Sequence, residues 1–516
     1  MPLALFGTKT NDTTPDALTQ DDFETVEHAD AQPMDVTDQT PGPNAEPASV
    51  QDGTIGSANM NKAFRMEASV EKGEVTFKEE SSVLGMISIR APEASEGADR
   101  PALDLVVCMD RSGSMRGSKI KLVKDTLESL VKKTGLNAQD RLSIVSFDTN
   151  VATEMPLVGM DACGKTRAEQ VVGKLVPGST TNLSGGLLQS IDILNTNPST
   201  DASRTRAVLL FTDGMANHGI TDQDQLNLAV KSVVAGTCTK IFTFGFGEDH
   251  NENMLRGIAS EGNGLYYYIK TVDDIGTAFG DCVGGIMSVV GQNATLTLNT
   301  PYSLGKVLGN YKTGDFKPGD QMAAIELGDL YSEDERDVLF EMKLPVLEAP
   351  TPEAERQVTA QLRVFSVATS RFEEVTVQVK VARPSETPPN QTINLRIDEQ
   401  RNRMIAAEAL ENAANLADTG NLFGGRMLLQ QALAACKASP ATSAGSELSA
   451  GLIAQMEEVE VTYSDTVQYR SMGSKMSRMH ATSHYQQKSN HMSADIYKGG
   501  SKGKAAVKRS WGLTSE

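Results

Sequence analysis

The 516-residue sequence lacks the features that mark membrane-spanning, zinc-binding and disulfide-stapled proteins. No stretch approaches the roughly 18 consecutive apolar residues that a membrane span needs. The five cysteines are scattered and form no CxxC pair, which argues against a zinc ribbon, a RING finger and a disulfide-rich secreted module. The start, MPLALFGTKTNDTTPD, has too short an apolar run and no basic lead-in for a secretory signal. We therefore expect a cytoplasmic protein with no membrane span.

Acidic and basic residues are unevenly distributed along the chain. The formal net charge is −19, which argues against nucleic acid as the main partner. Residues 1–60 carry 11 acidic residues against one lysine and few large apolar residues, so they are predicted to form a disordered acidic tail. Residues 466–516 carry nine basic residues against two acidic ones, and they are predicted to form a basic flexible tail.

Residues 99–290 alternate between buried strands and amphipathic helices. The run LDLVVCM (103–109) is apolar throughout, as in a strand that is buried on both faces. A helical pattern follows at 119–135, and 141–147 with 151–158 are predicted to form a hairpin with an edge strand. Helices are also expected at 166–175, 184–195 and 222–234, and strands at 206–211, 240–246 and 265–269. This alternation predicts an α/β fold with a doubly wound, mostly parallel sheet.

The segments on either side of this unit have a different pattern. Residues 61–98 and 291–383 alternate apolar and polar residues, as antiparallel strands with one buried face do. We expect both segments to form one β-sandwich into which the α/β domain (99–290) is inserted. Residues 384–465 are predicted to be a helical region that begins with the linker PSETPP (384–389).

Three polar segments follow strands or loops of the α/β unit. They are Asp110–Gly117, the stretch 178–187, and the end of the strand at 209–214. Each is expected at the carboxyl edge of the parallel sheet, where open α/β sheets place their ligands.

These segments contain two carboxylates and three hydroxyls that offer only hard oxygen donors. They are Asp110, Ser112, Ser114, Thr181 and Asp213. Hard oxygens favour Mg²⁺, Mn²⁺ or Ca²⁺ over zinc or copper. Five residues fill the shell of such an ion only in part, so a position stays open for an acidic side chain from a partner protein. Taken alone, the D-x-S-x-S motif is also compatible with a helix N-cap.

The D-x-S-x-S motif, the later threonine and the later Asp-Gly resemble the von Willebrand factor type A (VWA) domain with its metal-ion-dependent adhesion site. The resemblance spans about 100–290 and implies that the same five residues, with Thr181 and not Thr180, hold the metal. The segment from Tyr469 resembles the additional C-terminal region of eukaryotic intracellular VWA proteins. Some of those relatives carry a RING finger and act as ubiquitin ligases, but the cysteines for one are missing here.

Four further patterns bear on other functions or on structural roles. Residues Gly159–Thr166 match the Walker A pattern, but the preceding segment is polar and contains a proline, unlike the buried strand that a P-loop follows.

His480 and His484 are spaced as metal ligands on a helix could be, and are interpreted as a solvated pair in the basic tail. His250 is interpreted as loop structure because no nucleophile motif accompanies it. The methionines at 472, 476 and 479 are expected to pack against the sandwich.

The sequence therefore predicts a protein that is not an enzyme and binds a partner protein through a Mg²⁺ ion. Two alternatives stay open. One is a substrate-binding component linked to a ubiquitin ligase, and the other is a P-loop nucleotide hydrolase.

Overall fold

The computed structural model describes residues 63–94, 100–199, 201, 203–271, 274–388, 391–489 and 496–513. These residues belong to one compact unit, Gly56–Glu516. The acidic segment 1–60, predicted to be disordered, lies outside the described residues.

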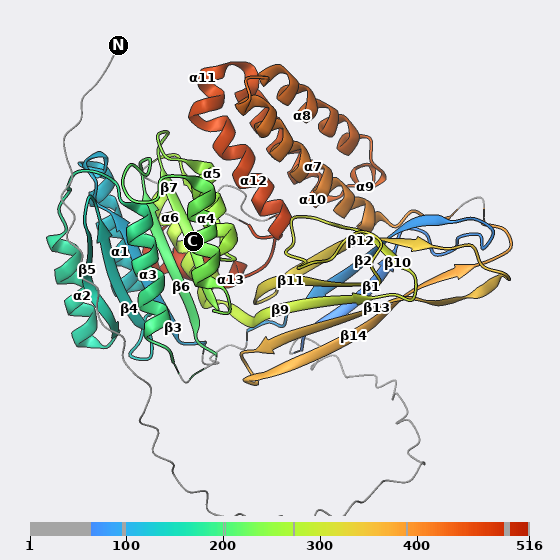
Figure 1. The fold of residues 1–516 in the computed structure, drawn as a ribbon, viewed down its shortest axis with the longest axis horizontal. Helices are drawn as coiled ribbons and strands as arrows, with labels where there is room; N and C mark the ends of the chain where they lie inside the picture. The colour runs from blue at the N-terminus through green and yellow to red at the C-terminus, as the bar shows by residue number, and fades with distance from the viewer. Residues whose placement is uncertain are drawn as a thin grey trace, which may run out of the picture. The chain divides into compact units, whose positions relative to one another are not determined.

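The described part of the α/β unit contains a six-stranded sheet with the spatial order β5-β4-β3-β6-β7-β8 (Figure 1). Its strands are β3 (Leu103–Asp110), β4 (Arg141–Phe147), β5 (Val151–Gly159), β6 (Thr205–Thr212), β7 (Thr239–Phe246) and β8 (Tyr266–Ile269). All neighbouring strands are parallel except β5, which pairs antiparallel with β4 at the edge. The predicted hairpin and its edge strand are confirmed.

Helices cover both faces of this sheet. One face packs against α1 (Ser118–Lys133), α2 (Ala162–Lys174) and α6 (Asp274–Met287), and the other against α3 (Leu183–Thr196), α4 (Gln223–Val234) and α5 (Glu252–Glu261). Successive residues of a strand point to opposite faces, so β3 gives Val106 and Cys108 to one core and Leu105 and Val107 to the other. The strand is therefore apolar along its whole length.

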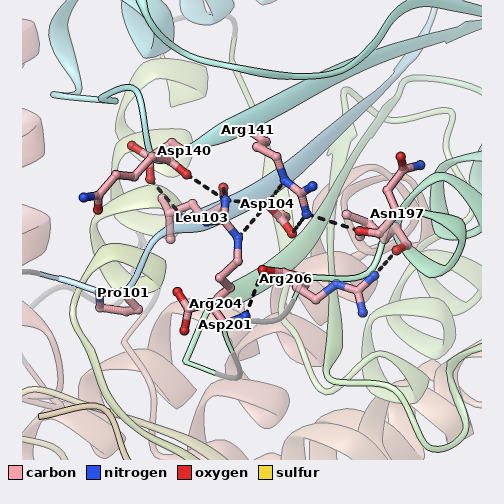
Figure 2. A network of polar contacts seen from close by, with 12 residues as sticks. Pro101, Leu103, Asp104, Asp140, Arg141, Asn197, Asp201, Arg204 and Arg206 are labelled. Atoms are coloured by element: carbon pink, nitrogen blue, oxygen red, sulfur yellow. Dashed lines mark hydrogen bonds and ion pairs between the residues drawn. The ribbon is translucent and has the colours of Figure 1, made fainter. Parts of the chain in front are cut away.

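A network of ion pairs ties strand starts together at the amino edge of the sheet (Figure 2). The fully buried Asp104 accepts hydrogen bonds from Arg141 at 2.8 and 2.6 Å and from Arg204 Nη2 at 2.7 Å. Burial alone would raise the pKa of Asp104, but the two guanidinium groups bring it below its ordinary value. Beside it, Asp140 pairs with Arg100 at 2.6 Å. These charges join β3, β4 and the start of β6, at the edge opposite Asp110.

Strands from before and after the α/β unit pair in one β-sandwich. They are β1 (Arg65–Val70), β2 (Ser81–Arg90), β9 (Val289–Asn299), β10 (Ser303–Leu308), β11 (Met322–Tyr331), β12 (Glu335–Leu344), β13 (Thr351–Ser366) and β14 (Arg371–Arg383). The two sheets have the orders β1-β2-β12-β10 and β11-β9-β13-β14. β2 pairs with β12 in unbroken antiparallel register, from Arg90 opposite Glu335 to Ser81 opposite Leu344. The predicted fold class is confirmed, while the domain boundaries given above stay predictions.

The C-terminal part of the chain is helical. Its helices are α7 (Leu395–Asp418), α8 (Leu422–Lys437), α9 (Pro440–Ser443), α10 (Glu447–Val461), α11 (Thr466–Gln468), α12 (Ser474–Gln486) and α13 (Ser501–Trp511). Short 3₁₀ turns occur at Gly113–Met115 and Thr462–Ser464, and a π turn occurs at Tyr469–Gly473. None of the described helices is both long and apolar enough to cross a membrane.

The prediction that 466–516 is a flexible tail is wrong for its described residues. Trp511 on α13 packs beside Phe279 of α6, with ring centroids 5.7 Å apart. Basic residues of the segment are paired with acids from elsewhere in the fold, for example Lys504 with Asp281 at 3.2 Å. Counting charges along the sequence could not reveal these partners, because they lie hundreds of residues away.

The interpretation of His480 and His484 as a solvated pair is also wrong. Their exposed fractions are 1% and 0%, and His484 Nδ1 lies 2.9 Å from the Tyr497 hydroxyl. Burial lowers the pKa of His484 well below its ordinary value. Met476 and Met479 are buried in the core that α12 shares with α7 and the helices of one sheet face, and not against the sandwich.

Candidate metal centre

The first strand of the sheet ends at the first candidate ligand. Asp110 is the last residue of β3, and Ser112 caps the 3₁₀ turn Gly113–Met115 that follows. Gly117 then connects this turn to α1 with a φ of 82°, a conformation that residues with a Cβ rarely adopt. The local chain path thus holds the D-x-S-x-S segment at the carboxyl edge.

The Asp110 carboxylate is held by hydrogen bonds on both oxygens. The Ser112 backbone N–H donates to Oδ1 at 2.7 Å, and the Thr212 hydroxyl donates to Oδ2 at 2.6 Å. Asp110 is completely buried. Its orientation is therefore fixed by two elements, the turn after β3 and the end of β6.

The other candidate ligands lie beside it. Ser112 Oγ is 3.0 Å from Ser114 Oγ, which donates to Asp213 Oδ1 at 2.7 Å. A Cβ placed on Gly214 would be 3.6 Å from both Ser114 Oγ and Thr181 Oγ1, which puts the Thr181 hydroxyl next to this group. The structure brings the five predicted residues together.

The neighbouring hydroxyl of Thr180 is used elsewhere. Its Oγ1 lies 2.7 Å from Thr149 Oγ1. Thr181 is instead fixed by Asn217, whose Oδ1 accepts the Thr181 N–H at 2.8 Å and whose N–H donates back to the Thr181 carbonyl at 3.2 Å. The sequence predicted Thr181 but not Asn217. No pattern in the loop after β6 indicates that Asn217 forms hydrogen bonds with the backbone of the Thr181 loop.

Burial dominates the electrostatics of the cluster. It raises the pKa of Asp110 to about 6, against the lowering effect of the Thr212 and Ser112 hydrogen bonds, and repulsion from Asp213 adds a smaller increase. The Asp213 side chain is completely buried, and Lys119 Nζ lies 2.5 Å from its Oδ2. Lys119 was also missed, because a lysine in the first turn of a helix is common on protein surfaces.

The donor set fits a hard divalent cation. Two carboxylates can balance a charge of +2, and the three hydroxyls add neutral oxygens. Among the described residues, no group of three or more His, Cys, Asp or Glu side chains comes together in a way that could hold a metal. A metal centre in this part of the chain therefore depends on hydroxyl oxygens. Ser114 is solvent-exposed, so the cluster is open on the side where an outside ligand would approach.

The Walker-like segment does not form a phosphate-binding loop. Gly159 ends the antiparallel edge strand β5, not a buried parallel strand. At the start of α2, Asp161 Oδ1 accepts the Gly164 N–H at 2.8 Å, so a carboxylate occupies the end of the helix where a P-loop would present amides to phosphate. His250 is buried against the Tyr266 hydroxyl at 2.6 Å, and burial lowers the pKa of His250 to about 4. Both observations fit structural roles.

The comparisons with known proteins identify the fold of the α/β unit. The model of the von Willebrand factor type A domain matches residues 104–281. The chain is 25% identical over 385 residues to the E3 ubiquitin-protein ligase WAV3 of Arabidopsis thaliana, which covers 72% of this chain and 48% of that protein. It is 33% identical over 166 residues to the human inter-alpha-trypsin inhibitor heavy chain H1, covering 31% of this chain and 18% of that one. The chain thus spans about half the length of the plant relative.

Two solved structures share the fold over most of the chain. A von Willebrand factor type A protein from Catenulispora acidiphila aligns with a TM-score of 0.61 and 16% identity, covering 77% of this chain and 90% of that one. The ArnB paralog VWA2 from Sulfolobus acidocaldarius aligns with a TM-score of 0.54 and 16% identity, covering 80% and 97%. Residues 104–281 of this chain are a von Willebrand factor type A domain.

Proposed function

We propose that the chain is a protein-binding module that captures an acidic side chain of a partner protein through a Mg²⁺ ion at the carboxyl edge of the VWA sheet. The observation that carries this proposal is the gathering of two buried carboxylates and three hydroxyls at one edge of the sheet. Its members are Asp110, Ser112, Ser114, Thr181 and Asp213. When bound, the ion would supply a positive charge with an open coordination position for a carboxylate. Mn²⁺ or Ca²⁺ could take the same oxygen donors.

The residues around the cluster suit a protein partner. Met215 and Val176 are 54% and 64% exposed on loops that flank the candidate ligands. Arg116 is exposed as well, and its Nη2 lies 3.5 Å from the Gly178 carbonyl. Apolar contacts around a charged centre give a binding surface both affinity and orientation.

Calorimetry and affinity capture test this proposal together. Wild type should bind Mg²⁺ with measurable heat and should retain a partner in Mg²⁺ but not in EDTA. Asp110→Ala should lose both properties, while Asp125→Ala, which removes an exposed carboxylate of α1, should keep both. Replacing one critical Asp or Glu of the captured partner should also end its retention. A partner retained equally by Asp110→Ala and in EDTA would refute the proposal.

We propose further that the chain is not itself an enzyme. The plant relatives are named ubiquitin ligases, and this chain aligns with about half of each. That likeness supports a second candidate function, a substrate-binding component that works with a ubiquitin ligase. The chain alone should show no ubiquitin transfer in a reconstituted reaction, and transfer by the chain alone would overturn the non-enzymatic assignment.

The five cysteines are free thiols, which supports a reducing compartment such as the cytoplasm.

A further inference from the structure

Five charged side chains are buried together where the VWA domain, the sandwich and the C-terminal segment meet. They are Lys240, Asp329, Asp334, Arg336 and Lys488, each at most 7% exposed. Four of them form two ion pairs. Lys240 Nζ lies 3.1 Å from Asp329 Oδ1, and Arg336 Nη2 lies 2.8 Å from Asp334 Oδ2.

Lys488 is the fifth charge, and no acid of the described residues forms an ion pair with it. Its Nζ lies over the Tyr331 ring, 4.3 Å from the ring centroid. The buried Asp281 is shared by two other lysines of the C-terminal segment, Lys504 at 3.2 Å and Lys508 at 3.5 Å. The described groups thus leave one buried cation without a counter-charge.

Burial makes this arrangement costly. It lowers the pKa of Lys488 to about 7, Arg336 and Lys240 act in the same direction, and the two aspartates oppose the change. A lysine that is buried without an acid either loses its proton or attracts an anion. An anion beside the ammonium would restore its charge.

Lys488 lines a cavity in which an anion could sit. The cavity has a volume of about 120 Å³, and its polar lining includes Arg336, Lys312, Tyr311, Asn310 and Gln486. This space holds more than a single water molecule. The lining has three cations and one acid, the exposed Glu326. Lys312 pairs with Glu261 at 3.6 Å and Arg336 with Asp334 at 2.8 Å, so Lys488 supplies the positive charge that has no acidic partner among the described residues. Tyr311 and Lys312 also line an adjoining cavity of about 740 Å³.

We propose that this cavity binds a tetrahedral oxyanion, as a free ion or as the phosphate group of a larger molecule, with Lys488 and Arg336 as its cationic donors. Tyr311, Asn310 and Gln486 also line the cavity. The Tyr311 hydroxyl accepts from Gln487 Nε2 at 3.3 Å and so keeps its own O–H to donate, and Gln486 Nε2 donates to the Gly264 carbonyl at 3.1 Å and keeps a second N–H. Lys488 comes from the C-terminal segment and Arg336 from the sandwich, so the anion would hold these two parts of the fold together. The site is separate from the metal centre.

Inorganic phosphate is the probe for the full chain. The melting temperature of wild type should rise with phosphate concentration and level off, by comparison with sodium chloride at the same ionic strength. Lys488→Met should lose this rise. Lys231→Met removes an exposed lysine on the rim of the larger cavity, and it should respond to phosphate as wild type does.

Further measurements keep the test decisive if Lys488→Met folds poorly. Lys488→Arg retains the positive charge and should retain the phosphate response. The ³¹P resonance of phosphate should broaden with wild type but not with Lys488→Met. Phenyl phosphate distinguishes the sources, since a response to it indicates a phosphate group on a larger molecule, and a response to inorganic phosphate alone indicates the free ion. An equal melting shift in wild type and Lys488→Met, or no shift in wild type, would overturn the proposal.

Discussion

Asp110→Asn should have opposite effects on stability without and with Mg²⁺. In EDTA at pH 8 the variant should be more stable than wild type, because it removes a carboxylate that is buried without a cation beside it. In excess Mg²⁺ the order should reverse, because only wild type gains stability by binding the ion. The two conditions separate the structural cost of the carboxylate from its role as a ligand.

The size of the first effect follows from the pKa of Asp110. A pKa raised from 3.8 to about 6 corresponds to about 3 kcal/mol of folding free energy at high pH. The Asn side chain keeps only part of the hydrogen bonding with Thr212 and Ser112, and each lost bond costs about 1 kcal/mol. A net gain of about 1–2 kcal/mol should remain. Mg²⁺ at 100 times its dissociation constant would raise the unfolding free energy of wild type by about 2.7 kcal/mol.

The pH dependence gives an independent check of the sign of the stability difference between Asp110→Asn and wild type. A carboxyl with a raised pKa in the folded state costs stability above that pKa and costs nothing below its unfolded value. The pH-dependent part of the difference, about 3 kcal/mol, should therefore be fully present above pH 6 and be lost as the pH falls towards 3.8, where the lost hydrogen bonds leave Asp110→Asn less stable than wild type. Urea unfolding at several pH values measures it, and Asp125→Asn serves as the exposed control. An EDTA-treated variant that is less stable than wild type at pH 8 would refute the reasoning.

Three other outcomes are expected. Lys165→Ala should bind Mg²⁺ and the partner as wild type does, because Asp161 occupies the start of α2. A filter assay should find no saturable ATP binding in wild type that is lost in the variant. Deleting 64–92 should leave the protein insoluble or lower its melting temperature sharply, since it removes the strand that pairs with β12; a soluble product with unchanged melting would contradict this. Asp104→Asn should cost about 3–5 kcal/mol in urea unfolding at pH 7, because Arg141 and Arg204 lose their buried partner. Wild type should lose the same stabilisation as the pH falls through the lowered pKa of Asp104.

The α/β unit and its candidate ligands were predictable because their signals are local. An uninterrupted apolar run such as 103–109 can only be buried on both faces, and the polar residues that follow it must emerge at the strand end. Parallel strands then bring Asp110 and Asp213 to the same edge although about a hundred residues separate them. Pattern and topology were sufficient to group the two carboxylates with a set of nearby hydroxyls, whereas the choice of Thr181 over Thr180 came from the resemblance to the VWA domain.

The residues that sequence reasoning missed act through contacts distant in sequence. Lys119 faces Asp213, and Asn217 locks the loop of Thr181, yet neither residue type is unusual at its position. The C-terminal segment was misjudged for the same reason. Its basic residues look solvated until the fold supplies acids such as Asp281 and Asp418. Composition describes a segment in isolation, whereas the burial and pairing of these basic residues depend on acids from other parts of the fold.

The C-terminal segment also limits which part of the carboxyl edge can meet a partner. β3, β6, β7 and β8 are parallel, so their ends share one edge of the sheet. At the β7–β8 side, the Ser474 hydroxyl donates to Glu252 at 2.6 Å, and the Tyr268 hydroxyl donates to the Ser471 carbonyl at 3.4 Å. At the β3–β6 side, Ser114 is exposed and Met215 is 54% exposed. Among the described residues, the C-terminal segment thus contacts the β7–β8 half of the edge, and the β3–β6 half presents the exposed Ser114 beside the buried carboxylates. A surface divided in this way is compatible with the proposed binding of a partner at the candidate metal centre.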